Sequence, residues 1–143
     1  MWRPSDITEI EGEAVKGGNW IILIKAATNV LKGDNFVIVY PELLQNKIIV
    51  KKGEVITSEI IGKNELDYKN INLKIRTLLR KTSDKIKSRG SVVNEITTRG
   101  DFIKKIIDSL ETNQNIKYRL EVVSLKDSKT ADPVIVDLNI NKK

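Results

Sequence analysis

Two residue types that carry much of protein chemistry, cysteine and histidine, are absent from the chain. Without cysteine, disulfides, thiolate catalysis and zinc fingers are excluded. Without histidine, the commonest general acid–base group and the commonest transition-metal ligand are missing as well. Any catalysis would have to rest on carboxylates, lysine, tyrosine, serine or threonine, or on a magnesium-type site.

Aromatic residues are scarce: the chain has two tryptophans, three tyrosines and two phenylalanines. Proteins that stack the bases of single strands usually cluster aromatics on one sheet face, so this binding mode is disfavoured. There is also no apolar run long enough to span a membrane, and the N-terminus MWRPSDITEIEGE lacks the apolar core of a signal peptide. We therefore expect a soluble, cytoplasmic protein that does not contact membranes.

Charged residues are abundant and unevenly distributed, with a formal net charge of +6. Residues 1–61 carry seven basic and eight acidic residues, whereas residues 62–143 carry 18 basic and 11 acidic ones. The net charge of +7 in the second part predicts a polyanionic partner there, DNA or RNA.

The first part, residues 1–61, has the pattern of an arm followed by a small β module. Residues 1–18 form the arm, and Trp20–Ile24 is a short apolar run typical of a strand buried on both faces. Such a module would be marginally stable alone, so we expect it to pack against the second part. Further strands are predicted at Phe36–Tyr40, where Pro41 stops the strand, at Lys47–Lys51 and at Val55–Ile61.

The second part, residues 62–143, begins with a basic helix. Apolar residues recur at helical spacing from Ile71 to Ile86, and Gly90 supplies a left-handed cap. Alternatively, residues 71–75 form a short strand and the helix starts near Thr77. Seven basic residues accompany a single acid between Asn72 and Arg89. Those that we expect to contact nucleic acid are Arg76, Arg80, Lys81, Lys85 and Arg89.

The rest of the chain predicts a strand, a tight turn, an amphipathic helix and two long strands. The strand is Val92–Thr98, the turn is Arg99-Gly100-Asp101 with Asp101 as the helix cap, and the helix runs to about Thr112. The long strands are Ile116–Leu125 and Val134–Ile140, joined by a polar, flexible hairpin tip at residues 126–133.

The sequence offers no arrangement typical of catalysis. Gly17-Gly18 lacks the Lys-Ser/Thr and the spacing of a phosphate-binding loop. Glu121 with Lys126 has the wrong spacing for a metal-dependent nuclease, and no partner carboxylate is placed by spacing near Glu54 or Glu59. We therefore expect a protein that is not an enzyme and has no metal or cofactor.

The stretch Ser88–Glu111 resembles the Alba family of small basic chromatin and RNA-binding proteins. An Arg-Gly turn precedes a helix of a characteristic pattern in that family, and the basic C-terminus resembles the family's last strand. The resemblance covers roughly residues 60–143. Gly62-Lys63-Asn64 stands where the family has a Gly-Lys-Lys-Pro-like loop, without the second lysine and the proline. The matching residues are Arg99-Gly100, Phe102-Ile103, Lys105–Asp108 and Glu111, with Leu138–Lys143 at the end.

The resemblance implies an α+β, two-layer domain with the order β-α-β-α-β-β, preceded here by the β-rich module. It also implies a homodimer that contacts the backbone of duplex DNA or RNA without sequence preference. Whether the first strand of this domain is 54–61 or 71–75 stays open. Lys63 and Arg99 would contact phosphates, and Lys126 and Lys129 would lie on a hairpin arm along the minor groove.

Two functions follow from these patterns. The first is a non-enzymatic nucleic-acid-binding protein with a basic face. The second is a structural subunit of a larger complex or a mobile-element particle, which docks through its β-rich N-terminal half.

Overall fold

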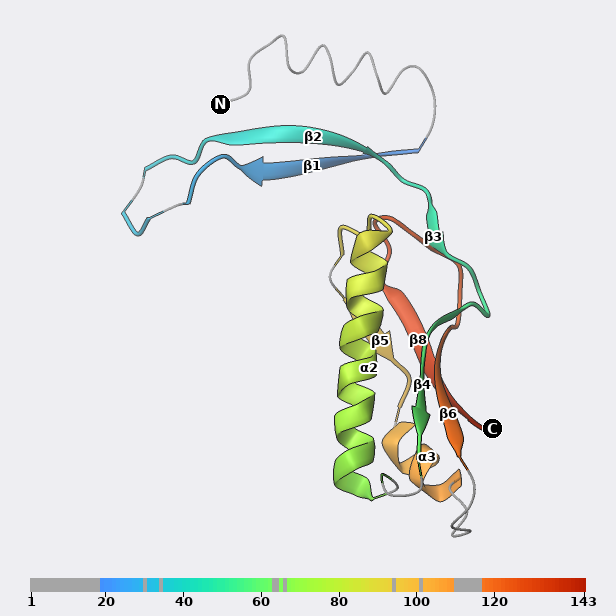
Figure 1. Ribbon diagram of the computed structural model, residues 1–143. Coiled ribbons are helices and arrows are strands. Elements are labelled where there is room, and N and C mark those ends of the chain that lie inside the picture. The colour runs from blue at the N-terminus through green and yellow to red at the C-terminus, as the bar shows by residue number, and fades with distance from the viewer. Residues whose placement is uncertain are drawn as a thin grey trace. The chain divides into compact units, whose positions relative to one another are not determined.

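The computed structural model shows a mixed α+β protein, the class that the sequence predicts (Figure 1). Its described residues are 19–29, 31–33, 35–62, 65, 67–93, 95–100, 102–109 and 117–143. These ranges contain eight strands and two helices. The chain divides into two compact units, an N-terminal unit of residues 1–47 and a C-terminal unit of residues 48–143.

The N-terminal unit contains an antiparallel pair of strands, β1 (Trp20–Ala26) and β2 (Val39–Gln45). The register between them is unbroken over seven residue pairs. The strand predicted at Trp20–Ile24 is confirmed, but its predicted burial on both faces is wrong. Ile22 and Ile24 are 48% and 57% exposed, because the sheet formed by the described strands has only two members.

Pro41 does not stop β2, contrary to the prediction. The Ala27 N–H donates to the Ile38 carbonyl at one end of the pair, and the Asn46 N–H donates to the Asn19 carbonyl at the other. Odd-numbered residues of β1 therefore bond to β2, because the pattern alternates along a strand. Pro41 stands opposite the even-numbered Ile24, where the ladder needs no N–H. The expected strand Phe36–Tyr40 instead starts at Val39 and ends at Gln45.

The C-terminal unit is built on a four-stranded sheet with the order β4-β6-β8-β5. Its members are β4 (Val55–Ile61), β6 (Tyr118–Ser124), β8 (Val134–Lys142) and β5 (Ile96–Thr98). The pairs β4–β6 and β6–β8 are antiparallel, whereas β5 pairs in parallel with β8. Alternate residues of β6 are buried, from Tyr118 to Ser124, so one face of the sheet carries the core.

Two helices supply the other half of the core. Helix α2 (Tyr68–Ser88) packs on β4 and β6, and α3 (Phe102–Ser109) packs on β8. Ile75 and Leu78 of α2 and Ile106 of α3 are buried with Leu120 and Val136 of the sheet in one hydrophobic cluster. Neither described helix is long and apolar enough to cross a membrane.

A small two-stranded ribbon lies at the end of the C-terminal unit where α2 ends. Strand β3 (Ile48–Val50) pairs with β7 (Ser128–Lys129), which lies in the connection between β6 and β8. Ser128 and Thr130 are buried, and the Val92 N–H donates to the Thr130 carbonyl. The prediction of a free, flexible hairpin tip at residues 126–133 is therefore wrong, because the backbone of this connection is hydrogen-bonded to β3 and to Val92.

Residues 71–75 are helical and residues 55–61 form a strand, which resolves the alternative left open for the first strand. The strand expected at Val92–Thr98 is confined to Ile96–Thr98, while the Asp101 cap and the helix end at Thr112 lie outside the described residues. The compact unit begins at Ile48 rather than after the expected boundary at Ile61, because β4 pairs with β6.

Candidate nucleic-acid interface

The basic helix α2 has well-defined ends. At its start, the Asp67 carboxylate accepts a hydrogen bond from the Asn70 backbone N–H at 2.7 Å, which is an N-cap. At its end, Gly90 has a φ of 103°, a value that favours glycine. The Gly90 N–H donates to the Lys87 carbonyl and the Ser91 N–H to the Ile86 carbonyl, the two bonds of a Schellman cap. Both ends of the helix are therefore closed by hydrogen bonds.

One face of α2 is buried against the sheet. Thr82 lies among the buried residues of this face, where its hydroxyl donates to the Leu78 carbonyl at 2.8 Å and shares a hydrogen bond with the Thr57 hydroxyl of β4. This polar pair fixes the register between helix and strand. The buried side chains are Ile71, Ile75, Leu78, Thr82 and Ile86.

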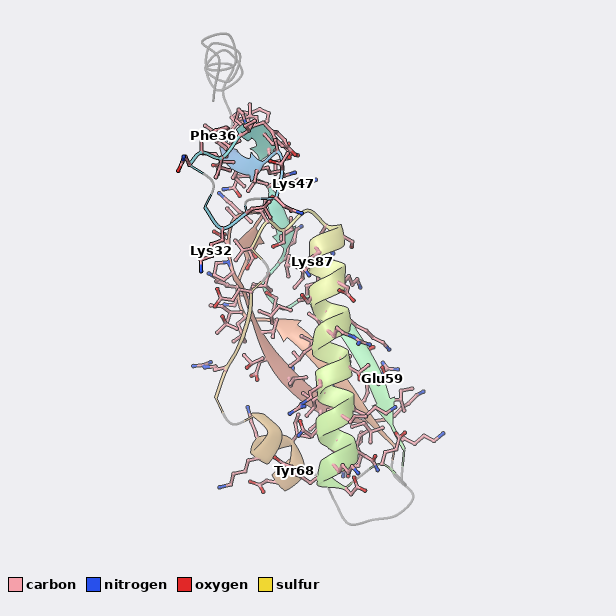
Figure 2. The ribbon with its side chains drawn as sticks, turned by 90° about the vertical axis from the view of Figure 1, so that its left-hand side faces the viewer. Lys32, Phe36, Lys47, Glu59, Tyr68 and Lys87 are labelled. Atoms are coloured by element: carbon pink, nitrogen blue, oxygen red, sulfur yellow. The ribbon has the colours of Figure 1, made fainter. Side chains whose placement is uncertain are left out.

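The cations that flank this buried face are paired with β4. The Glu59 carboxylate lies 3.1 Å from the Lys81 ammonium and 3.6 Å from the Lys74 ammonium. Lys74 also lies 3.5 Å from Glu65. Figure 2 shows Glu59 beside α2, with Tyr68 and Lys87 toward opposite ends of the helix. Lys81, predicted as a nucleic-acid contact, therefore binds the protein itself.

Lys85 and Arg89 continue this line of internal contacts. The Lys85 ammonium donates to the Ile56 carbonyl at 2.7 Å. The Arg89 guanidinium lies 2.7 Å from the Glu54 carboxylate and donates to the Ile49 carbonyl at 3.0 Å. These two residues, also predicted as nucleic-acid contacts, attach the C-terminal half of α2 to β3 and β4.

The same contacts lower the pKa values of Glu54 and Glu59. The hydrogen bond from Lys81, together with the charges of Lys81 and Lys74, lowers the pKa of Glu59 against the opposing effect of burial. Burial alone would raise the pKa of Glu54, but hydrogen bonds from the Lys51 N–H and from Arg89 outweigh it and leave the pKa lowered. Both carboxylates are therefore held ionised as partners of the helix.

A second set of cations lies on the opposite, solvent-facing side of α2. Lys69, Arg76, Arg80 and Lys87 are all exposed, and they follow one another at intervals of seven, four and seven residues. At 3.6 residues per turn these positions fall within about 40° of one another around the helix axis. At a rise of 1.5 Å per residue they extend over about 27 Å. We call these four residues the outer row.

The outer row has few other functional groups beside it. Asp84 lies four residues after Arg80 on a neighbouring position and is exposed. Leu73, which is also exposed, lies between Lys69 and Arg76. For the described residues, the structure gives no ion pair to any member of the outer row. The row is thus a strip of positive charge with one acid at its edge.

The remaining predicted contacts lie on other elements. Lys63 lies outside the described residues. Arg99 is exposed in the turn between β5 and α3. Lys126 and Lys129 are exposed and lie beside Asp127 and Asp132, whose carboxylates accept from the backbone N–H groups of Lys52 and Lys129. Of the predicted set, the part of the chain that the structure describes thus combines Arg76 and Arg80 on one open face.

Two members of the outer row, Lys69 and Lys87, were not among the residues predicted from the sequence to contact nucleic acid. Their positions carry a signal, because residues 69, 76, 80 and 87 share one side of any continuous helix. For Lys69 that signal depends on the helix starting before residue 69, and the sequence left the start of the helix open. Lys87 lies in the helix under either start.

A hollow of about 330 Å³ lies where α2 meets β4. Both of its glutamates contact Lys74. Within the described ranges, no group of three or more acidic residues is arranged to hold a metal ion. The lining residues are Glu59, Glu65, Asn70, Leu73, Lys74 and Thr77.

In comparisons with known proteins, no family model, no curated protein and no solved structure matches the chain.

Proposed function

We propose that the protein binds nucleic acid without catalysing a reaction, and that the outer row of α2 contacts the phosphate backbone. The observation that carries this proposal is the division of the basic helix into two sides. Lys74, Lys81, Lys85 and Arg89 are used to hold α2 on β3 and β4. The other four cations make no ion pair to the described residues and are all exposed. They are Lys69, Arg76, Arg80 and Lys87.

The chemistry of the row suits a phosphate backbone. Arginine and lysine are the main donors to phosphate oxygens, and such contacts position a protein without reading sequence. The row is straight, and the helix backbone that carries it is anchored by its buried face, so only the side-chain rotamers have to be ordered on binding. The row itself contains no aromatic residue on which a base could stack. These features favour backbone contact over base recognition.

The order of elements also supports the proposal. From β4 to β8 the main elements follow as strand, helix, strand, helix, strand, strand, the order that the Alba-like resemblance implies. The resemblance also implies a hairpin arm, whereas the connection that bears Lys126 and Lys129 is bonded to β3 and to Val92. We therefore place the main contact on α2 and give Arg99, Lys126 and Lys129 a secondary part.

The proposal is tested by titrating duplex DNA and duplex RNA with the full chain at about 50 and 200 mM salt, a range over which phosphate contacts lose much of their strength. We expect binding at low salt that weakens steeply. A variant with Lys69, Arg76, Arg80 and Lys87 all replaced by glutamine should reduce the slope of log K against log salt by about 3 to 4, because each DNA phosphate that the protein neutralises adds about 0.9 to that slope.

A matched control removes the same charge elsewhere. Lys51, Lys52, Lys104 and Lys117 are exposed residues on other elements, and their replacement by glutamine should leave most of the slope intact. Failure of the unmodified protein to bind at low salt would sink the proposal. So would an equal loss of binding in the two quadruple variants.

A second function, that of a subunit in a larger assembly, is favoured by one observation. Exposed apolar side chains gather on the N-terminal unit, where Phe36 is 77% and Leu31 71% exposed. An apolar surface of this kind is typical of a docking site. The two functions are compatible, because the outer row and these side chains belong to different units of the chain.

A further inference from the structure

The outer edge of β1 differs from the two edges of the four-stranded sheet. In the C-terminal unit, β5 is an edge strand of only three residues. The other edge strand, β4, has an irregularity near Val55 and a carbonyl, that of Ile56, bonded to Lys85. Short strands, irregularities and lysines are the usual means of protecting an edge from pairing. β1 has seven residues, an unbroken register and no proline, and its one lysine, Lys25, is paired with Glu42 of β2.

The pairing pattern shows which groups of β1 lie at this edge. Because odd-numbered residues bond to β2, the even-numbered Ile22 and Ile24 direct their N–H and C=O groups away from it. Among the described residues β1 has no second neighbouring strand. On β2, by contrast, Pro41 removes a donor from the outer edge. β1 is therefore the side of the hairpin on which another strand can add.

The composition of β1 is that of a central strand. Six of the seven residues in WIILIKA are apolar, so apolar side chains point to both faces of the sheet, as in strands that are covered on both faces. A two-stranded sheet is marginally stable in water, and three or more strands are usually needed. Among the described residues, β1 thus lacks the second neighbouring strand that is typical of its composition.

We propose that the neighbour is β1 of a second copy of this chain, paired antiparallel across a twofold axis. The resulting order β2-β1-β1-β2 places both apolar strands at the centre and both proline-containing strands at the edges. A pairing centred on Leu23 overlaps the whole strand and sets Ile22 opposite Ile24 of the second copy. Lys25 is the only charged residue of β1 and falls opposite Ile21, so no like charges oppose each other. The interface is isologous, as a twofold dimer requires.

The inference does not depend on nucleic-acid binding, and it is tested without nucleic acid. Sedimentation equilibrium of the full chain should show a concentration-dependent dimer of twice 16.2 kDa. The variant Ile22→Lys/Ile24→Lys places lysine opposite lysine at two positions and should be monomeric. The variant Ile22→Glu/Ile24→Glu should be monomeric for the same reason. Mixed in equal amounts, the two variants should form a heterodimer, because opposite charges then face each other.

A matched control and a second measurement complete the test. The variant Val37→Lys/Ile38→Lys adds the same charge at exposed positions outside β1 and should dimerise like the unmodified chain. In the unmodified chain, the amide hydrogens of Ile22 and Ile24 should exchange more slowly as the concentration rises, while that of Leu23, which faces β2, should be protected throughout.

Several results would overturn the inference. A monomeric unmodified chain at all concentrations would do so, as would a dimer that persists in the double-lysine variant. Failure of the mixed variants to associate, with both shown to be folded by circular dichroism, would also contradict it. If the variants do not fold, concentration-independent exchange of the Ile22 and Ile24 amides in the unmodified chain would be decisive against the pairing.

Discussion

The Lys81 ammonium lies 3.1 Å from the Glu59 carboxylate, while its neighbour in sequence, Arg80, points its side chain into solvent. The two cations are adjacent in the chain but about 100° apart around the helix axis. One of them holds α2 on β4, and the other belongs to the outer row. Under the proposed function, this pair of adjacent residues separates the structural role of the basic helix from its binding role.

The first prediction compares single substitutions at these two positions. Arg80→Gln should weaken duplex binding several-fold and leave the melting temperature almost unchanged, because Arg80 has no hydrogen bond or ion pair to another described residue. Lys81→Gln should have the opposite profile, with a loss of stability of about 0.5 kcal/mol, typical of an exposed ion pair, and little loss of affinity. Binding titrations and thermal melts of the two variants check this. Similar effects of both substitutions on affinity would contradict the division of roles.

The second prediction concerns acid. The pKa values of Glu54 and Glu59 are lowered in the folded protein relative to their ordinary value of 4.5. Their contribution to stability is therefore fully present above the unfolded pKa and is lost as the pH falls through the lower folded pKa. We expect the melting temperature to drop as the pH falls from about 5 to 3. The variant Glu54→Gln/Glu59→Gln should be less stable near neutral pH and should show a shallower acid decline. An unchanged decline would show that these two groups do not contribute.

The third prediction concerns the hydroxyl pair between α2 and β4. Thr82 is fully buried and shares a hydrogen bond with Thr57. Thr82→Val should destabilise the protein by about 1 to 2 kcal/mol, because it leaves the Thr57 hydroxyl without this partner. The double variant Thr57→Val/Thr82→Val removes both polar groups and should be more stable than Thr82→Val alone. Urea denaturation midpoints measure both values, and a double variant that is less stable than the single one would contradict the pairing.

The fourth prediction concerns the end of α2. Gly90 has a φ of 103° and donates to the Lys87 carbonyl. Gly90→Ala should cost about 1 kcal/mol, because a residue with a Cβ is strained at positive φ. No atom lies within 4 Å of the position that the added Cβ would take, so the effect should come from the backbone alone. A urea midpoint equal to that of the unmodified protein would argue against the Schellman cap.

Local patterns in the sequence predicted much of this fold. The apolar spacing from Ile71 to Ile86 gave the basic helix, and the Arg99-Gly100 turn gave the change from strand to helix. These features depend on residues close together in the chain. The cation candidates could not be sorted in the same way. Glu59 of β4 and Glu54 in the turn before that strand precede the helix in the chain, and they meet it only in the folded protein.

The errors at Pro41 and at residues 126–133 have the same origin. Whether a proline interrupts a strand depends on which edge its nitrogen faces, and this is set by the register with β1. The polar residues from Lys126 to Pro133 have the composition of a free tip, yet β7 pairs with β3 far upstream in the chain. Long-range strand pairing decides both cases, and it leaves little trace in local composition.

The most direct test of the binding account follows the arginine side chains by NMR during a titration with duplex DNA. The account predicts that the Nε–H signals of Arg76 and Arg80 shift or broaden as the duplex is added. The Nε–H signal of Arg89, whose guanidinium is engaged by Glu54 and the Ile49 carbonyl, should stay in place. Shifts at Arg99 or Arg119 with no change at Arg76 and Arg80 would contradict the outer row as the binding surface.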